Sequence, residues 1–150
     1  MADTLGSLCD KLTIIKLKQW HSSDAERLAS LQAHGEQIQT EINEYIGAAL
    51  GGLIPLERLV FPANKVYKQN SIILDEMFGN IGELFAQLAH INCALWHEQE
   101  KVYDFENIPI AEKDVVVKKL AVLNLQRNQC IDGIDIKFCN GLNMKAQNKT

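Results

Sequence analysis

The three prolines of this chain limit most strongly what it can fold into, because all of them lie in two connectors. Pro55 and Pro62 stand in GGLIPLERLVFPAN, residues 51–64, and Pro109 stands in DFENIPIAEKD, residues 104–114. Proline interrupts helices, so the stretches outside these connectors are free to form long ones. Apolar residues in the first stretch recur at the spacing of a buried helical face, at Leu8, Leu12 and Ile15. No segment shows convincing strand alternation, so the sequence predicts an all-α fold.

Start and stop signals divide the chain into four expected helices. These cover residues 4–21, 23–49, 64–103 and 111–140. Ser23 and Glu26 have the spacing of a capping box at the start of the second helix, and Gly51-Gly52 would end it. The third helix should be broken or bent near Gly79, because glycine weakens helices. The polar tail, residues 142–150, is expected to be flexible.

Two parts of the sequence repeat each other in the same order. Residues 8–24, which contain Trp20-His21, align with residues 84–100, which contain Trp96-His97. Residues 28–46 align with residues 120–138, mostly at apolar positions. The repeat predicts two copies of a helical hairpin, with units at about 4–50 and 64–140. Two antiparallel hairpins would form a four-helix bundle in a single domain of residues 1–150.

Composition excludes several classes of protein. Of the 150 residues, 47% are hydrophobic and 23% are charged, which is typical of a globular domain. The net charge of -4 argues against nucleic-acid binding. No apolar run is long enough to cross a membrane, and no signal peptide is visible. The four cysteines form no CxxC pair, so we expect buried, reduced thiols in a cytoplasmic protein.

The Trp-His repeats raise the question of a metal site. His97 and Glu100 lie at i and i+3, so they would share a helical face, and His21 and Asp24 would do so only if the first helix continued past Ser22. Diiron bundles use the reverse order, Glu-x-x-His, with further inward glutamates that are not found here. The alternative is structural, with each Trp at the core edge, its indole N–H bonded and its neighbouring His facing solvent. The structural alternative is favoured, and no cofactor is expected.

Polar residues follow one face of the last helix, and charges flank the apolar face of the first. The stripe on the last helix consists of Asn124, Arg127, Asn128, Asp132 and Asp135. The charges on the first are Asp10, Lys11 and Lys18. If the two faces meet, they would form an ion-pair network or a pocket for a small anionic ligand. A solvated stripe with local salt bridges is favoured over a ligand site.

Three short blocks resemble two uncharacterised bacterial families. GSLCDKLTIIKLK, residues 6–18, resembles GELIDKLTILEIK of the first family. INCALWHEQEKVY, residues 91–103, resembles the pattern IN-x-x-LW-x-x-ED-x-x-R of both families, and LNLQRNQCIDGID, residues 123–135, is similar to LN-x-x-RN-x-x-I-x-x-ID of the second. The blocks cover under a third of the chain. The shared polar positions are Asp10, Lys11, Lys18, Asn92, Trp96, Glu100, Asn124, Arg127, Asn128 and Asp135.

The resemblance also has departures and a functional implication. Gln99 and Tyr103 stand where the family pattern has Glu and Arg, so chemistry that depended on those residues would be lost here. Genes of these families are often placed near glycosyltransferase and surface-polysaccharide genes. The resemblance therefore implies a cytoplasmic accessory role and no defined reaction.

The leading hypothesis is a cytoplasmic bundle that acts by binding rather than by catalysis. Its apolar connector, Leu53–Phe61, would pack on its own bundle or on a partner subunit, and a homodimer is the expected assembly. The alternative is a small enzyme or binding protein for a phosphorylated sugar or nucleotide-sugar. In that case Lys11, Arg127 and Asn128 would hold the anion, and His97 or Glu100 would act as acid or base. This alternative requires all of these side chains to face one cavity.

Overall fold

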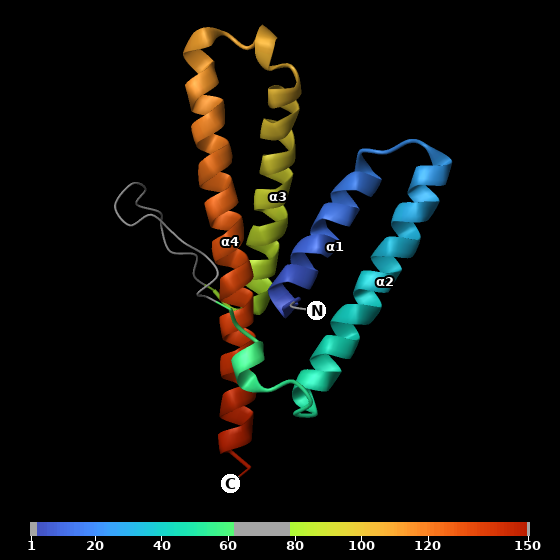
Figure 1. Cartoon of the computed structure of the whole chain (residues 1–150), viewed down its shortest axis with the longest axis vertical. Coiled ribbons are helices and arrows are strands. Elements are labelled where there is room, and N and C mark those ends of the chain that lie inside the picture. The colour runs from blue at the N-terminus through green and yellow to red at the C-terminus, as the bar shows by residue number, and fades with distance from the viewer. Residues whose placement is uncertain (1–2, 62–78, 150) are drawn as a thin grey trace.

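The computed structural model describes residues 3–61 and 79–149, and these residues form four α-helices and no strand. The helices are α1 (Leu5–Trp20), α2 (Ala25–Leu50), α3 (Ile81–Tyr103) and α4 (Ile110–Gln147), with short 3₁₀ turns η1 (Leu56–Arg58) and η3 (Phe105–Asn107) in the connectors (Figure 1). The predicted all-α, four-helix architecture is confirmed. No helix in the described part of the chain is long and apolar enough to cross a membrane.

The first two helices are capped by short polar side chains. The Thr4 hydroxyl accepts a hydrogen bond from the Ser7 N–H, and Ser7 bonds back to the Thr4 N–H, which forms a capping box. The predicted capping box of Ser23 and Glu26 is wrong, because α2 is capped one residue later. There Asp24 accepts from the Arg27 N–H at 2.8 Å. An aspartate at this position also complements the positive end of the helix dipole.

The ends of the last two helices differ in part from the prediction. Gly79 has φ of +145°, a conformation that favours glycine, and Asn80 and Glu83 form a capping box that starts α3 at Ile81. The break expected near Gly79 therefore coincides with the start of this helix, and the part expected over residues 64–78 lies outside the described residues. The predicted end of the last helix at Asn140–Gly141 is wrong, because α4 continues to Gln147.

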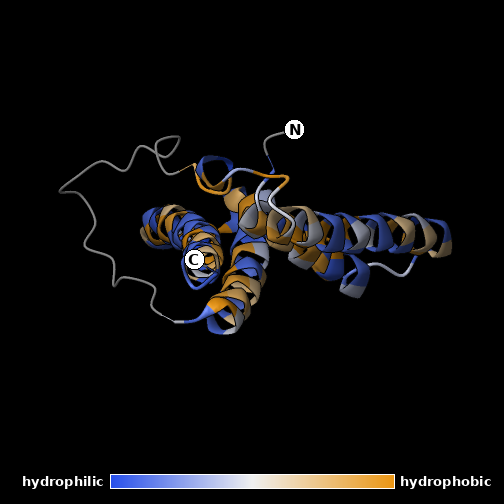
Figure 2. Ribbon diagram, turned by 90° about the horizontal axis from the view of Figure 1, so that it is seen from below, coloured by the Kyte–Doolittle hydropathy of each residue, from blue (hydrophilic) through white to orange (hydrophobic). Residues whose placement is uncertain are grey.

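The helices pair as two antiparallel hairpins, α1–α2 and α3–α4, that meet through α1 (Figure 1). The first half of α1 packs against α3 and α4, whereas α2 packs mainly against α1. From this meeting point the two hairpins diverge toward their tips. Seen from below, α1 and α2 extend to one side of α3 and α4 (Figure 2).

One apolar cluster joins the two hairpins. Its buried members are Leu5, Cys9, Leu84, Leu88, Ile91, Leu95, Cys130 and Ile134. Leu88, Cys130 and Ile134 are fully inaccessible to solvent. The C-terminal half of α2 reaches the same cluster through Ile42, Tyr45 and Ile46. Burial of these side chains provides the main stabilising free energy of the fold.

The two hairpins come into close main-chain contact at Gly6. A Cβ atom at this position would collide with the main-chain oxygen of Ile131 on α4. The Gly6 N–H donates to Asp135 Oδ1 at 2.7 Å, which gives the buried carboxylate of Asp135 a partner. Only glycine allows α1 to lie this close to α4.

The connector after α2 packs onto its own bundle. Leu59 is 1% exposed, and the Cys139 thiol on α4 lies 3.8 Å from the main-chain oxygen of Leu56. The turn expected in this connector corresponds to η1. The cysteines are all free thiols, but only Cys9 and Cys130 are buried, and burial raises the pKa of each to about 11. The expectation of buried thiols is wrong for Cys93 and Cys139, which are partly exposed.

Candidate functional site

A cavity of about 520 Å³ lies where α1 begins to diverge from α3 and α4. Its lining residues are Ile14 from α1; Asn92, Leu95, Trp96, Gln99, Glu100 and Tyr103 from α3; and Asn124 and Arg127 from α4. The α3 residues follow one helical face, since they recur every three or four positions. The cavity therefore combines apolar and aromatic walls with carboxamides and two charged groups.

A hydrogen-bonded network behind this cavity fixes α1 against α3 and α4. Arg127 forms a two-pronged ion pair with Asp10, with Nε donating to Oδ1 at 2.8 Å and Nη2 to Oδ2 at 2.5 Å. Asn92 Nδ2 donates to Asp10 Oδ1 at 2.9 Å and to Thr13 Oγ1 at 2.7 Å. The Asp10 side chain is 9% exposed. A buried carboxylate of this kind needs such partners, because its desolvation is costly.

This network decides between two predictions for the polar face of the last helix. The charged faces of the first and last helices do meet, at Asp10 and Arg127, and there they form an ion pair. The favoured solvated stripe is wrong for Asp135, which is buried at 4% exposure, and for Arg127, which bonds Asp10 in the interface, whereas Asn124 is exposed. The hydrogen bonds from Arg127 to Asp10 raise the pKa of the guanidinium, so it stays charged and paired.

Asn92 is the most buried residue of the cavity lining, at 1% exposure. Its amide orientation is set by Asp10, which only accepts hydrogen bonds and must therefore face the Nδ2 group. The other end, Oδ1, is buried and accepts no hydrogen bond from any described residue. A buried acceptor left without a donor costs about 1–3 kcal/mol.

The two Trp-His repeats meet at the edge of this cavity, and each contributes a different side chain. The His21 ring at the end of α1 stacks on the indole of Trp96, with ring centroids 4.7 Å apart. The Trp96 indole N–H donates to Glu100 Oε1 at 2.9 Å. His97 is exposed and contacts the edge of His21, with centroids 6.1 Å apart.

The structural interpretation of the repeats is thus confirmed for Trp96 and wrong for Trp20. Trp96 lies at the core edge with its N–H bonded, and its neighbour His97 faces solvent. Trp20 is 85% exposed, because α1 ends there, where it has diverged from the other hairpin (Figure 1).

The four side chains predicted as metal ligands do not form one ligand set. Helix α1 ends before His21, so His21 and Asp24 share no helical face. The His21 Nδ1 lies 2.9 Å from the main-chain oxygen of Leu17, and Asp24 caps α2. His97 Nδ1 lies 3.7 Å from Glu100 Oε2. Within residues 3–61 and 79–149, no group of three or more His, Cys, Asp or Glu side chains is arranged to hold a metal ion.

The remaining predicted residues are dispersed. Lys11 is exposed and bonds Asp3 at 2.8 Å, which lowers the pKa of the Asp3 carboxyl. Lys18, Asn128 and Asp135 do not line the cavity. Of the ten predicted ligand-binding residues, the cavity collects Trp96, Glu100, Asn124 and Arg127, with Asp10 behind them.

Sequence reasoning missed the apolar half of the lining and a second ion cluster. Ile14 and Leu95 line the cavity, and neither is among the residues that the sequence predicted to bind a ligand. Glu98, at 4% exposure, accepts hydrogen bonds from Lys119 at 2.6 Å and Lys101 at 3.0 Å. Lys119 chiefly, and Lys101 with it, hold the pKa of the Glu98 carboxyl below its ordinary value. The sequence signal that could have revealed this ion cluster is the charge of Glu98, which lies within the apolar face of α3.

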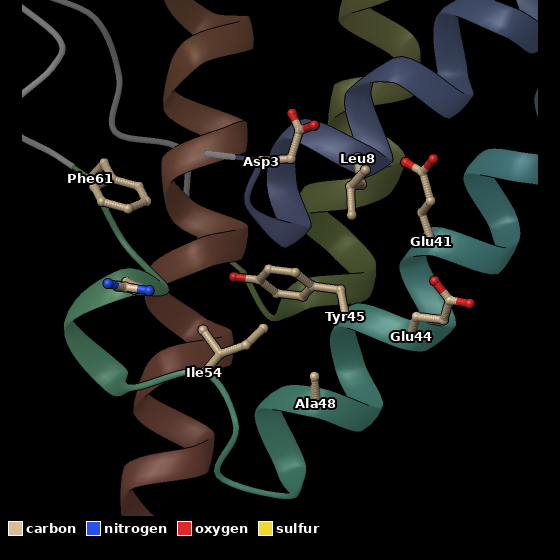
Figure 3. A pocket seen from close by; sticks show the side chains of 9 residues that line it. Asp3, Leu8, Glu41, Glu44, Tyr45, Ala48, Ile54 and Phe61 are labelled. Atoms are coloured by element: carbon tan, nitrogen blue, oxygen red, sulfur yellow. The ribbon is translucent and has the colours of Figure 1, made fainter. Parts of the chain in front are cut away.

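A second cavity, of about 690 Å³, lies between α2 and the connector that follows it (Figure 3). The Tyr45 ring projects from α2 into it, with Leu8 on one side and Ala48 and Ile54 on the other. Burial raises the pKa of Tyr45 to about 12, so the phenol stays neutral. Glu41 and Glu44 border this cavity on α2. It holds none of the ten residues predicted to bind a ligand.

No protein-family model, curated protein or solved structure matches this chain. The resemblance to the two uncharacterised families therefore stays a prediction.

Proposed function

We propose that this protein is a non-catalytic binding module whose ligand occupies the cavity between its two hairpins. The observation that carries this proposal is the pairing of Arg127 with Asp10 at the back of the cavity. The Arg127 guanidinium therefore holds the two hairpins together. It shapes the cavity and does not react in it.

The groups that catalysis would require do not converge on this cavity. His97 is not part of the lining, and Lys11 bonds Asp3. Glu100 lines the cavity but accepts the Trp96 indole N–H. General acid–base chemistry needs a positioned proton donor and acceptor facing the same substrate. These placements support binding over the enzymatic alternative.

The size and lining of the cavity support binding of a small molecule. Ligand sites in proteins commonly enclose about 300–1,000 Å³, with apolar and aromatic walls and a few polar groups that orient the ligand. A cavity of about 520 Å³ with Leu95 and Trp96 in its walls fits this description. The resemblance suggests that such a module would serve as a cytoplasmic accessory protein in surface-polysaccharide metabolism.

The chain contains its own reporter for a test of this proposal. Its only two tryptophans give two indole N–H signals in a ¹H–¹⁵N spectrum, one from Trp96 in the cavity and one from exposed Trp20. We would titrate ¹⁵N-labelled protein with phenol, glucose, glucose 1-phosphate, adenosine and inorganic phosphate. A ligand in the cavity shifts the Trp96 signal in a saturable way and leaves the Trp20 signal in place.

A matched pair of variants locates the site. Gln99→Phe fills the cavity from an exposed lining position, and Gln39→Phe places the same change on the exposed face of α2. We expect the first variant to abolish the Trp96 shift and the second to retain it. Saturable conversion of a panel compound into a product would contradict the non-catalytic proposal, and a panel that never moves the Trp96 signal would contradict the site.

A further inference from the structure

The cationic group of the cavity lining, Arg127, is already paired within the protein. Arg127 and Glu100 are the charged residues among its lining side chains, and they have opposite signs. Arg127 is also neutralised by the two hydrogen bonds to Asp10. A phosphate group would therefore meet a compensated guanidinium and a nearby carboxylate, which is an unfavourable electrostatic setting.

Besides the Tyr103 hydroxyl and the Trp96 indole N–H, the cavity lining contains three carboxamides placed on two helices. Asn92 and Gln99 come from α3 and Asn124 comes from α4. The Asn124 Nδ2 bonds the main-chain oxygen of Leu120 in its own helix at 3.1 Å, which directs the amide along α4. A carboxamide both donates and accepts hydrogen bonds, as a hydroxyl group does.

The innermost of these groups lacks a donor. Asn92 is 1% exposed, its Nδ2 is fully used by Asp10 and Thr13, and its Oδ1 accepts no hydrogen bond from the described residues. Since this Oδ1 is also closed to solvent, the carboxamides that a ligand in the cavity can reach are those of the exposed residues Gln99 and Asn124. A hydroxyl can both donate to and accept from such a carboxamide, whereas a phosphate dianion can only accept.

The aromatic residues of the cavity suit the apolar faces of a ring. One face of the Trp96 indole is covered by His21, and Trp96 and Tyr103 both line the cavity. A flat nucleobase has its polar atoms in a single plane, whereas the carboxamides here are spread over α3 and α4. A saturated ring with hydroxyls around its circumference matches that spread better.

We infer that the cavity binds an uncharged, hydroxyl-rich molecule the size of a mono- or disaccharide, through the carboxamides of Gln99 and Asn124 and the Trp96 ring. This inference rests on the proposed function and specifies the ligand class of the same site. The inferred ligand also differs from that of the alternative hypothesis, which is a phosphorylated sugar or nucleotide-sugar.

The test follows the Trp96 indole signal of the full chain, with the Trp20 signal as internal control. The probes are glucose, N-acetylglucosamine and maltose, compared with glucose 1-phosphate, adenosine and phenol. Concentrations up to about 50 mM detect millimolar affinity. We expect a saturable Trp96 shift with at least one neutral sugar, and a weaker response to glucose 1-phosphate.

Two exposed lining residues test the carboxamides without disturbing the buried network. Gln99→Ala and Asn124→Ala should each weaken sugar binding about five-fold, as expected for one lost hydrogen bond. Gln39→Ala and Asn43→Ala, the same substitutions on the exposed face of α2, should leave the affinity unchanged.

The outcomes distinguish this inference from the proposed function. A Trp96 shift with phenol, adenosine or glucose 1-phosphate, but with no neutral sugar, overturns the inference and leaves a binding site at the cavity. A sugar affinity that neither Gln99→Ala nor Asn124→Ala changes also overturns it. If no probe moves the Trp96 signal, both the ligand class and the cavity site are wrong.

Discussion

The interface inside the α3–α4 hairpin and the interface where α1 docks onto that hairpin are held by different interactions. Within α3–α4, apolar residues such as Leu88, Cys130 and Ile134 pack at zero exposure along the shared face. Where α1 docks onto that hairpin, buried polar residues join the apolar ones: Asp10, Thr13, Asn92 and Asp135. The first interface is held mainly by apolar burial, with one buried ion pair between Glu98 and Lys119, whereas the second depends on several directed hydrogen bonds as well.

The difference shows how the bundle acquires a cavity. Apolar packing alone tolerates a range of helix positions, whereas the pairs Asp10–Arg127 and Asp135–Gly6 require one placement of α1. With α1 fixed at its first half, its second half diverges and leaves space beside Ile14. The polar docking interface thus sets the shape of the candidate site.

The largest effect is expected from breaking the ion pair of the docking interface. Asp10→Ala leaves Arg127 and Asn92 without their shared acceptor, and should lower the free energy of unfolding by about 3 kcal/mol. Chemical denaturation measures this loss, with Asp114→Ala on the exposed face of α4 as control. The double variant Asp10→Leu/Arg127→Met should recover much of the stability, since it removes both charges. If Asp10→Ala and Asp114→Ala had equal free energies of unfolding, the structural role of the Asp10–Arg127 pair would be contradicted.

The next effect concerns the close contact of α1 with α4. Gly6→Ala places a methyl group against the main-chain oxygen of Ile131, and should destabilise the protein by about 2 kcal/mol. Gly47→Ala is the matched control, because no atom lies within 4 Å of the added Cβ. It should stabilise α2 by about 0.5–1 kcal/mol. Shifts of the same sign in the two denaturation midpoints would show that the hairpins do not meet at Gly6.

A pH-dependent effect is expected within the α3–α4 hairpin. Glu98 is held ionised by Lys119 and Lys101, so the unfolded chain binds its proton more tightly than the folded protein does. Its contribution is therefore complete at neutral pH and is lost as the pH falls through the lowered pKa. Glu98→Gln should cost about 1 kcal/mol at pH 7.

The pH profile of the melting temperature tests this sign. The difference in melting temperature between wild type and Glu98→Gln should disappear below about pH 4. Glu106→Gln, in the exposed turn η3, should show little difference at any pH. A difference for Glu98→Gln that grows toward acid would mean that the pKa is raised and the assigned ion pairs are wrong.

The smallest effect is expected at Trp20, which is exposed although its counterpart in the other repeat, Trp96, is packed. Trp20→Ala should change the free energy of unfolding by less than about 0.5 kcal/mol, because Trp20 is 85% exposed. Trp96→Ala should cost more, since it removes the stack with His21 and the bond to Glu100. Comparable losses for both variants, measured by denaturation, would show that the two repeats are used equivalently.

The sequence by itself determined the helices and their order. Proline placement and apolar periodicity are local properties, so they predicted α1 and α2 within a few residues and the start of α4 within one. Local signals failed at the end of α4, because its last turns carry no apolar stripe to indicate a continuing helix. They also misplaced the cap of α2, since Ser23 and Asp24 are adjacent and both suit that role.

Tertiary structure alone decided how the polar residues are used. Asp10 and Arg127 are separated by 117 positions, and only the docking of α1 on α4 makes them partners. The same docking places His21 of one Trp-His repeat on Trp96 of the other. Helical periodicity predicts which side chains share a face, but the face that each one meets depends on how the two hairpins pack. That packing, fixed by the contact at Gly6 and the buried polar network, produced the cavity that the sequence could not reveal.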